Sequence, residues 1–186
     1  MRCLLFPCLA LSLSSAAFAA DDQSISSAVS SAPASTGLDA LSAYAGSWHT
    51  EIHYFDTPYS QKRDTAYELR NDCWRSAGFY ACDQFIGGES KALVIYTYDA
   101  AHGYSSYPIP VGAEEVHVGH LEIQGKVWTF PWKTIKDGKT TYFHVTNTWD
   151  SPDSIEFRQE YSADGQRWLP MSQGHETRIK QSSNKP

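Results

Sequence analysis

Three side chains that could bind a metal ion alternate along one short segment of the sequence. His49, Glu51 and His53 are each separated by one residue, so on a β-strand all three would point to the same side. Imidazole and carboxylate groups in this arrangement suit zinc or copper. The same alternation is typical of the solvated face of a strand, and the choice between the two interpretations depends on the direction of the neighbouring Trp48.

The remaining candidates for cofactor chemistry are scattered histidines. An axial haem ligand could come from His117, His120, His144 or His175. Of these, His144 is flanked by two apolar residues, which predicts that its own side chain lies on the opposite, outer face. The sequence contains no Gly-x-Ser-x-Gly, no P-loop and no dinucleotide fingerprint. We therefore expect no bound metal or cofactor and assign no catalytic residue.

Two cysteines flank a segment that resembles a β-hairpin. If Ala77-Gly78 forms a two-residue turn, Cys73 lies opposite Cys82 at a non-hydrogen-bonded position. At such a position the Cα atoms approach to ~4.5 Å, which is within reach of a disulfide. We predict a structural disulfide, formed in an oxidising compartment. The alternative is two reduced cysteines packed as small apolar residues.

The same register divides the hairpin into two faces. One face places Asp72 opposite Asp83, a pair that could share one proton of raised pKa but that we interpret as two solvated carboxylates. The other face has no carboxylate and is the better candidate for a barrel interior. It contains Thr65, Tyr67, Leu69, Asn71, Cys73, Tyr80, Cys82, Gln84 and Ile86.

Length, composition and charge restrict the class of protein. The 186 residues are enough for one domain with a hydrophobic core. Aromatic residues make up 13% of the chain, which favours β-strands over helices. The formal net charge of −6 argues against binding of nucleic acid, since a phosphate backbone requires a basic surface.

The N-terminal segment resembles an export signal. Residues 1–20 combine Arg2 with a short apolar core and a small-x-small motif at their end. Residues 21–37 are rich in Ser and Ala and lack aromatic residues, which predicts a flexible linker. No apolar run is long enough to predict a membrane span. We expect a periplasmic or secreted protein with a folded domain at 38–180 and a disordered tail at 181–186.

The folded region alternates between strands and turns. Leu38, Leu41 and Ala45 recur at helical spacing, which predicts a short helix that ends at Gly46. Turn residues then separate about ten strands, and such a meander removes its exposed edges by closing into an antiparallel barrel. A two-sheet sandwich is the alternative. The predicted strands are 46–55, 63–76, 79–87, 90–99, 103–109, 114–124, 126–134, 139–149, 154–162 and 167–180.

Three motifs resemble the lipocalin-like (calycin-type) β-barrels found among exported bacterial proteins. They are Gly46-Ser47-Trp48, Tyr98-Asp99 ahead of Gly103-Tyr104, and the segment from Tyr161 to Trp168. The resemblance spans about residues 38–180 and implies a barrel in which Trp48 points inward and closes one end. The His49 triplet, offset by one residue, would then face solvent. The haem-binding barrels continue the opening motif with further glycines, whereas Thr50 and Glu51 follow here, which argues against haem.

These observations predict a protein that holds a small, largely apolar or aromatic molecule in a barrel cavity. One alternative is an enzyme of isomerase or hydrolase type, which would need a carboxylate or histidine inside the barrel. Another is a structural envelope protein whose barrel is filled by its own side chains, including the aromatic stripe Trp128, Phe130 and Trp132. The predicted ligand-binding residues are Trp48, Tyr67, Leu69, Asn71, Tyr80 and Gln84.

Overall fold

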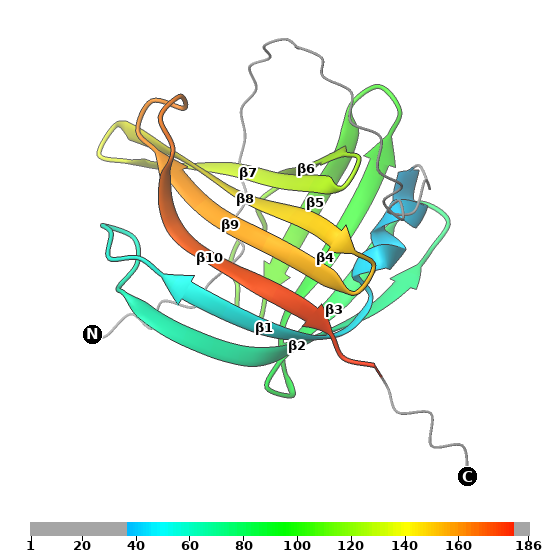
Figure 1. The fold of residues 1–186 in the computed structure, drawn as a ribbon. Coiled ribbons are helices and arrows are strands. Elements are labelled where there is room, and N and C mark those ends of the chain that lie inside the picture. The colour runs from blue at the N-terminus through cyan, green and yellow to red at the C-terminus, as the bar shows by residue number, and fades with distance from the viewer. Residues whose placement is uncertain (1–36, 181–186) are drawn as a thin grey trace, which may run out of the picture.

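Ten antiparallel strands close into a barrel in the computed structural model, which describes residues 37–180 (Figure 1). Each strand pairs with its neighbours in the sequence, and the first strand also pairs with the last, so the sheet has no open edge. The prediction of a closed antiparallel barrel is confirmed, and the sandwich alternative is wrong. In chain order the strands are β1 (Gly46–Tyr54), β2 (Arg63–Arg75), β3 (Tyr80–Ile86), β4 (Glu89–Asp99), β5 (Gly103–Pro110), β6 (Gly119–Gln124), β7 (Val127–Lys136), β8 (Lys139–Ser151), β9 (Ser154–Ser162) and β10 (Leu169–Arg178).

Within residues 37–180, one short helix precedes the barrel. This 3-10 helix, η1 (Gly37–Tyr44), packs against β2, β3 and β4 and buries Leu38 and Leu41 in the core. Gly46 follows with a φ of 108°, in the region that favours glycine, so the chain turns there from the helix into β1. The predicted short helix and its end before Gly46 are therefore confirmed.

Several predicted segments lie outside the described residues. They are the leader at 1–20, the tail at 181–186 and all of the linker at 21–37 except Gly37, which is the first residue of η1. Within residues 37–180, no helix is long and apolar enough to cross a membrane.

The start of β6 differs more from the prediction than any other strand boundary. β6 begins at Gly119, whereas the alternation of the sequence predicted a strand from residue 114, and its pairing with β5 covers only Tyr104 to Ser106. The N–H group of Val111 donates to β4, so positions 108 and 110 turn toward β6. Both are prolines and have no N–H group to donate. The pairing of β5 with β6 therefore ends before the first of them.

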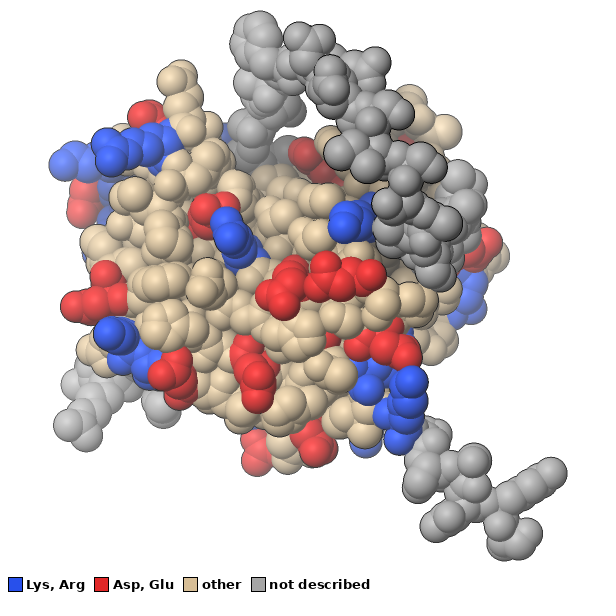
Figure 2. Space-filling view, in the orientation of Figure 1, with Lys and Arg blue, Asp and Glu red and all other residues tan. Residues whose placement is uncertain are grey.

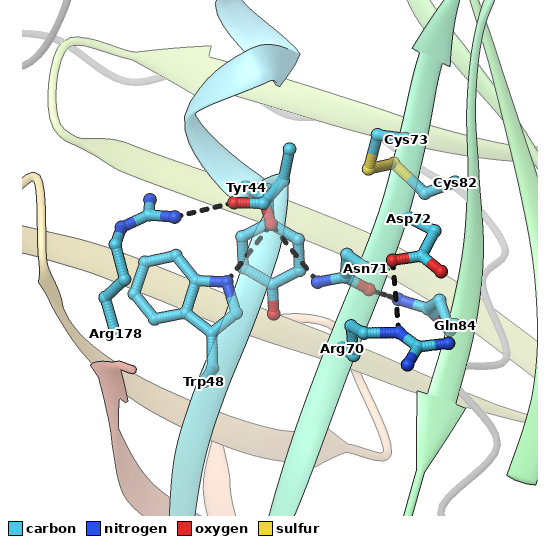
Figure 3. The surroundings of a disulfide bond; sticks show 10 residues. Tyr44, Trp48, Arg70, Asn71, Asp72, Cys73, Cys82, Gln84 and Arg178 are labelled. Carbon is cyan, nitrogen blue, oxygen red and sulfur yellow. Dashed lines mark hydrogen bonds and ion pairs between the residues drawn. A yellow bond between two sulfur atoms is a disulfide. The ribbon is translucent and has the colours of Figure 1, made fainter. Parts of the chain in front are cut away.

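The cysteine hairpin has the predicted register. Cys73 lies opposite Cys82 with their Cα atoms 4.0 Å apart, and the two are joined by a disulfide (Figure 3). Asp72 lies opposite Asp83 on the outer face, where Arg70 pairs with the exposed Asp72 at 3.1 Å. The disulfide prediction is confirmed, and the aspartate pair is solvated as expected.

A glycine allows β10 to lie close to its neighbours. Gly174 is paired with Ile52 on β1 and with Phe157 on β9. A Cβ atom at Gly174 would overlap the carbonyl oxygen of Glu51 and would lie 2.6 Å from the Phe157 ring. The constraint is therefore one of space, since any side chain here would push β10 away from β1.

We expect Gly174→Ala to destabilise the fold by roughly 1–3 kcal/mol, because the added methyl group meets backbone that cannot move aside. Gly78→Ala is the matched control, since a Cβ atom at Gly78 has no neighbour within 4 Å. Urea unfolding of both variants with the disulfide intact measures the difference. Equal stabilities would show that the strands can separate without cost.

Candidate functional site

The barrel encloses a cavity of about 430 Å³. Its wall is built by side chains from η1 and from every strand except β6, and aromatic and aliphatic groups make up most of it. Glu89, Lys91 and Val111 line it where the wall meets solvent, since Glu89 and Val111 are exposed. The aromatic members of the wall are Tyr44, Tyr54, Tyr67, Tyr96, Phe130 and Phe157.

The predicted ligand-binding residues fall into two groups. Those that line the cavity are Tyr67, Leu69 and Gln84. Those that are buried in the core away from the cavity wall are Trp48, Asn71 and Tyr80. All of them point to the inside of the barrel, as the register of the cysteine hairpin predicted for five of them and the family resemblance implied for Trp48. The second group packs nearer the end of the barrel that η1 covers.

Trp48 and its partners hold the helix against the barrel. The indole N–H of Trp48 donates to the carbonyl oxygen of Tyr44 at 3.1 Å, and the amide of Asn71 donates to the same oxygen at 3.2 Å (Figure 3). The guanidinium of Arg178 lies over the indole ring at 4.1 Å and donates to the carbonyl oxygen of Ala45 at 2.6 Å. These contacts fix the end of η1 and with it the side chain of Tyr44, which points into the cavity.

A buried carboxylate lies in the cavity wall. Glu176 lines the cavity and is 6% exposed. Among the described residues that are buried, it is the only charged one. The hydroxyl of Tyr44 donates to its two carboxylate oxygens at 3.0 and 3.3 Å. On the next strand, Thr50 is paired with Glu176, and its buried hydroxyl has no hydrogen-bond partner within residues 37–180. A buried hydroxyl without a protein partner commonly forms its hydrogen bond with a ligand or an ordered water molecule.

The surroundings of Glu176 shift its titration toward neutral pH. Burial raises the pKa of Glu176 from 4.5 to about 7, although the hydrogen bond from Tyr44 and the charge of His175 oppose the shift. Burial also raises the pKa of the Tyr44, Tyr67 and Tyr96 hydroxyls, so these groups stay protonated and act as donors. Glu176 can therefore gain or lose a proton near neutral pH inside an aromatic cavity, as catalytic and ligand-binding carboxyls do.

The histidine triplet lies on the outer face of β1, as predicted. His53 is 2.6 Å from the carboxylate of Asp64, and His49 is 3.6 Å from that of Glu51. Figure 2 shows acidic side chains across the middle of this side of the barrel. The triplet is therefore part of a solvated, charged surface and takes no part in the cavity.

The described residues that could hold a metal ion together are also on the outside. Asp150, Glu156 and His175 each offer a ligand atom, and these atoms lie within 4.8 Å of one another. The ring of His175 is hydrogen-bonded directly to Glu156 at 2.8 Å, and the two acidic residues are exposed. His144 points outward as expected and pairs with Glu160 at 2.9 Å. None of the described histidines lines the cavity.

Comparisons with known proteins do not assign the chain to a family. No protein-family model matches it, and no curated protein is similar to it in sequence. Among solved structures, the crystal structure of Rv2717c from M. tuberculosis matches with a TM-score of 0.47 and 16% sequence identity, over 77% of this chain and 97% of that chain. Membership of the lipocalin-like family therefore stays a prediction.

We expect Glu176→Gln to stabilise the protein at pH 8 and to do so much less at pH 5. With a pKa raised from 4.5 to about 7, the contribution of Glu176 to stability is fully present below pH 4.5 and is lost as the pH rises through 7. At pH 8 the buried charge costs about 3 kcal/mol, and glutamine avoids this cost. Urea unfolding at the two pH values measures the effect.

The control for this experiment is Glu122→Gln, which removes an exposed carboxylate from β6. A gain in stability from Glu176→Gln that is equal at pH 5 and pH 8 would contradict a carboxyl group that titrates near neutral pH inside the barrel.

Proposed function

We propose that the protein binds a small, largely apolar or aromatic molecule in the barrel cavity. The observation that carries this proposal is the cavity of about 430 Å³ with its aromatic and aliphatic wall. Its size falls within the range of small-molecule sites, roughly 300–1,000 Å³, which combine an apolar lining with a few placed polar groups. Here those polar groups include Gln84 and Glu176.

The alternative of a structural protein requires a barrel that is filled by its own side chains, such as the aromatic stripe on β7. The predicted aromatic stripe on β7 is buried, and Trp128 and Trp132 pack into the core. Phe130, between them in the stripe, belongs to the same core and also lines the cavity. The aromatic residues of β7 therefore fill part of the barrel and leave space for a ligand beside them.

An enzyme is the second candidate, and Glu176 is the observation that favours it. A carboxyl group with a pKa of about 7 can act as a general acid or base at neutral pH. The two candidates differ in the fate of a bound compound. An enzyme would convert it, and Glu176→Gln would abolish the conversion while the compound still binds.

The proposal places the protein outside the cytoplasm. The disulfide between Cys73 and Cys82 supports this, because such bonds persist in oxidising compartments. The signal-like segment at 1–20 is the second argument. Export would bring the protein into contact with small molecules of the envelope or the medium.

We expect the neutral fluorescent probe N-phenyl-1-naphthylamine to bind the protein, and Leu69→Trp to weaken this binding. Leu69 lines the cavity, so a larger ring at this position occupies the space that the probe needs. Leu169→Trp is the matched control, since Leu169 is 40% exposed and lies outside the cavity wall. Fluorescence titration gives the affinities, and thermal unfolding shows that the variants are folded.

Absence of probe binding to the parent protein would contradict a binding function. So would a sharp loss of stability in Leu69→Trp with no effect on the probe, since overpacking of a solid core costs roughly 1–3 kcal/mol.

A further inference from the structure

We propose that the cavity selects ligands that carry a protonated amine, with the ammonium group bound between the Glu176 carboxylate and the aromatic rings around it. This inference rests on the proposed binding function and adds the charge of the ligand to it. It is carried by three features of the described residues: the partners of the carboxylate, the aromatic wall and the placement of the basic groups.

The carboxylate of Glu176 has no basic partner among the hydrogen bonds and ion pairs found for it in the described part of the chain. Its hydrogen bonds come from the hydroxyl of Tyr44. Arg178, two residues further along β10, forms an ion pair with Asp153 and donates hydrogen bonds to the backbone carbonyl oxygens of Ala43 and Ala45. A buried carboxylate without a cation is costly, and a cation supplied by the ligand would offset this cost.

The rings that line the cavity with Glu176 provide the second part of an ammonium site. Tyr44 contacts the carboxylate directly, and Tyr67 lies on the strand beyond Thr50 in the same row of the sheet. The faces of aromatic rings attract cations, and aromatic cages bind alkylated ammonium groups. Thr50, whose hydroxyl lacks a hydrogen-bond partner in the described structure, joins these two positions across β1 but is not among the residues that line the cavity.

The remaining basic groups near this site have acidic partners of their own, although the charge of His175 still favours the carboxylate form of Glu176. Lys91 lines the cavity but pairs with Glu89. His175 faces outward and pairs with Glu156. The other titratable groups that face the cavity are tyrosines, which are Tyr44 from η1, Tyr54 from β1, Tyr67 from β2 and Tyr96 from β4. An ammonium group in the cavity would therefore meet a carboxylate and neutral rings.

Binding of an amine in this way is linked to a proton. Below pH 7 the empty site holds a neutral carboxyl group, because burial raises the pKa of Glu176 to about 7. An ammonium group favours the carboxylate form, so the proton of Glu176 leaves for solvent when the amine binds. An aliphatic amine stays protonated up to about pH 10, and its affinity should rise between pH 5.5 and pH 8.

The test compares 4-phenylbutylamine with 4-phenylbutanol, which has the same body and no charge. Isothermal titration calorimetry of the full exported chain should show that the amine binds at least about 10-fold more tightly than the alcohol at pH 8. At pH 6, measurements in buffers of different ionisation enthalpy should detect the release of nearly one proton. In Glu176→Gln the preference for the amine and the proton release should both disappear, whereas Glu122→Gln should retain them.

Equal affinities for the amine and the alcohol in the parent protein would overturn the inference and leave the binding function standing. An amine preference that persists in Glu176→Gln would overturn it as well. If neither compound nor the naphthylamine probe binds, the binding function itself fails. The comparison of the two compounds on the parent protein needs no variant, so the inference is decided even if Glu176→Gln does not fold.

Discussion

The pairing of β1 with β10 is the contact on which the rest of this structure depends. It joins Trp48 to Arg178 at one end and Tyr54 to Ser172 at the other, so the two ends of the described chain form a single wall. Closing so long a loop carries an entropic cost that the pairing and the shared core must offset. Only when it is made do Thr50 and Glu176 become neighbours and the cavity become an enclosed space.

Much of the fold could be predicted because the information is local. The turn at Ala77-Gly78 fixes the register of its hairpin without reference to any other strand, and it therefore predicts the opposition of Cys73 and Cys82. Most of the other hairpin turns contain a glycine with a positive φ angle, and at Asp137-Gly138 both residues have one. The turn between β8 and β9, at Pro152-Asp153, contains no glycine. A chain of such hairpins has few alternatives to a meander. The predicted start of β6 at residue 114 was wrong because alternation within one strand carries no information about its partner. The partner strand β5 has prolines at positions 108 and 110, which have no N–H group to donate to β6.

The site could be predicted only in part, because it depends on contacts between distant segments. Alternation along the cysteine hairpin gives the direction of Tyr67 and Asn71 but not their depth in the barrel, so it could not separate the cavity wall from the region under η1. Glu176 was missed because no apolar residue marks the inner face of β10 around it. Its position follows only from the register with Thr50, which no turn fixes.

The short pairing between β5 and β6 means that backbone hydrogen bonding is not uniform around the barrel. Every other pair of neighbouring strands except β6 with β7 is joined over seven or more residue pairs, whereas this one ends at Ser106. Segments with few backbone hydrogen bonds open most readily. Pro110, the last residue of β5, and Val111, which follows it, both line the cavity. Local opening between β5 and β6 would therefore expose the cavity to solvent, while the disulfide hairpin and the end of the barrel at Trp48 stay closed. A molecule in the cavity could then enter or leave without global unfolding of the protein.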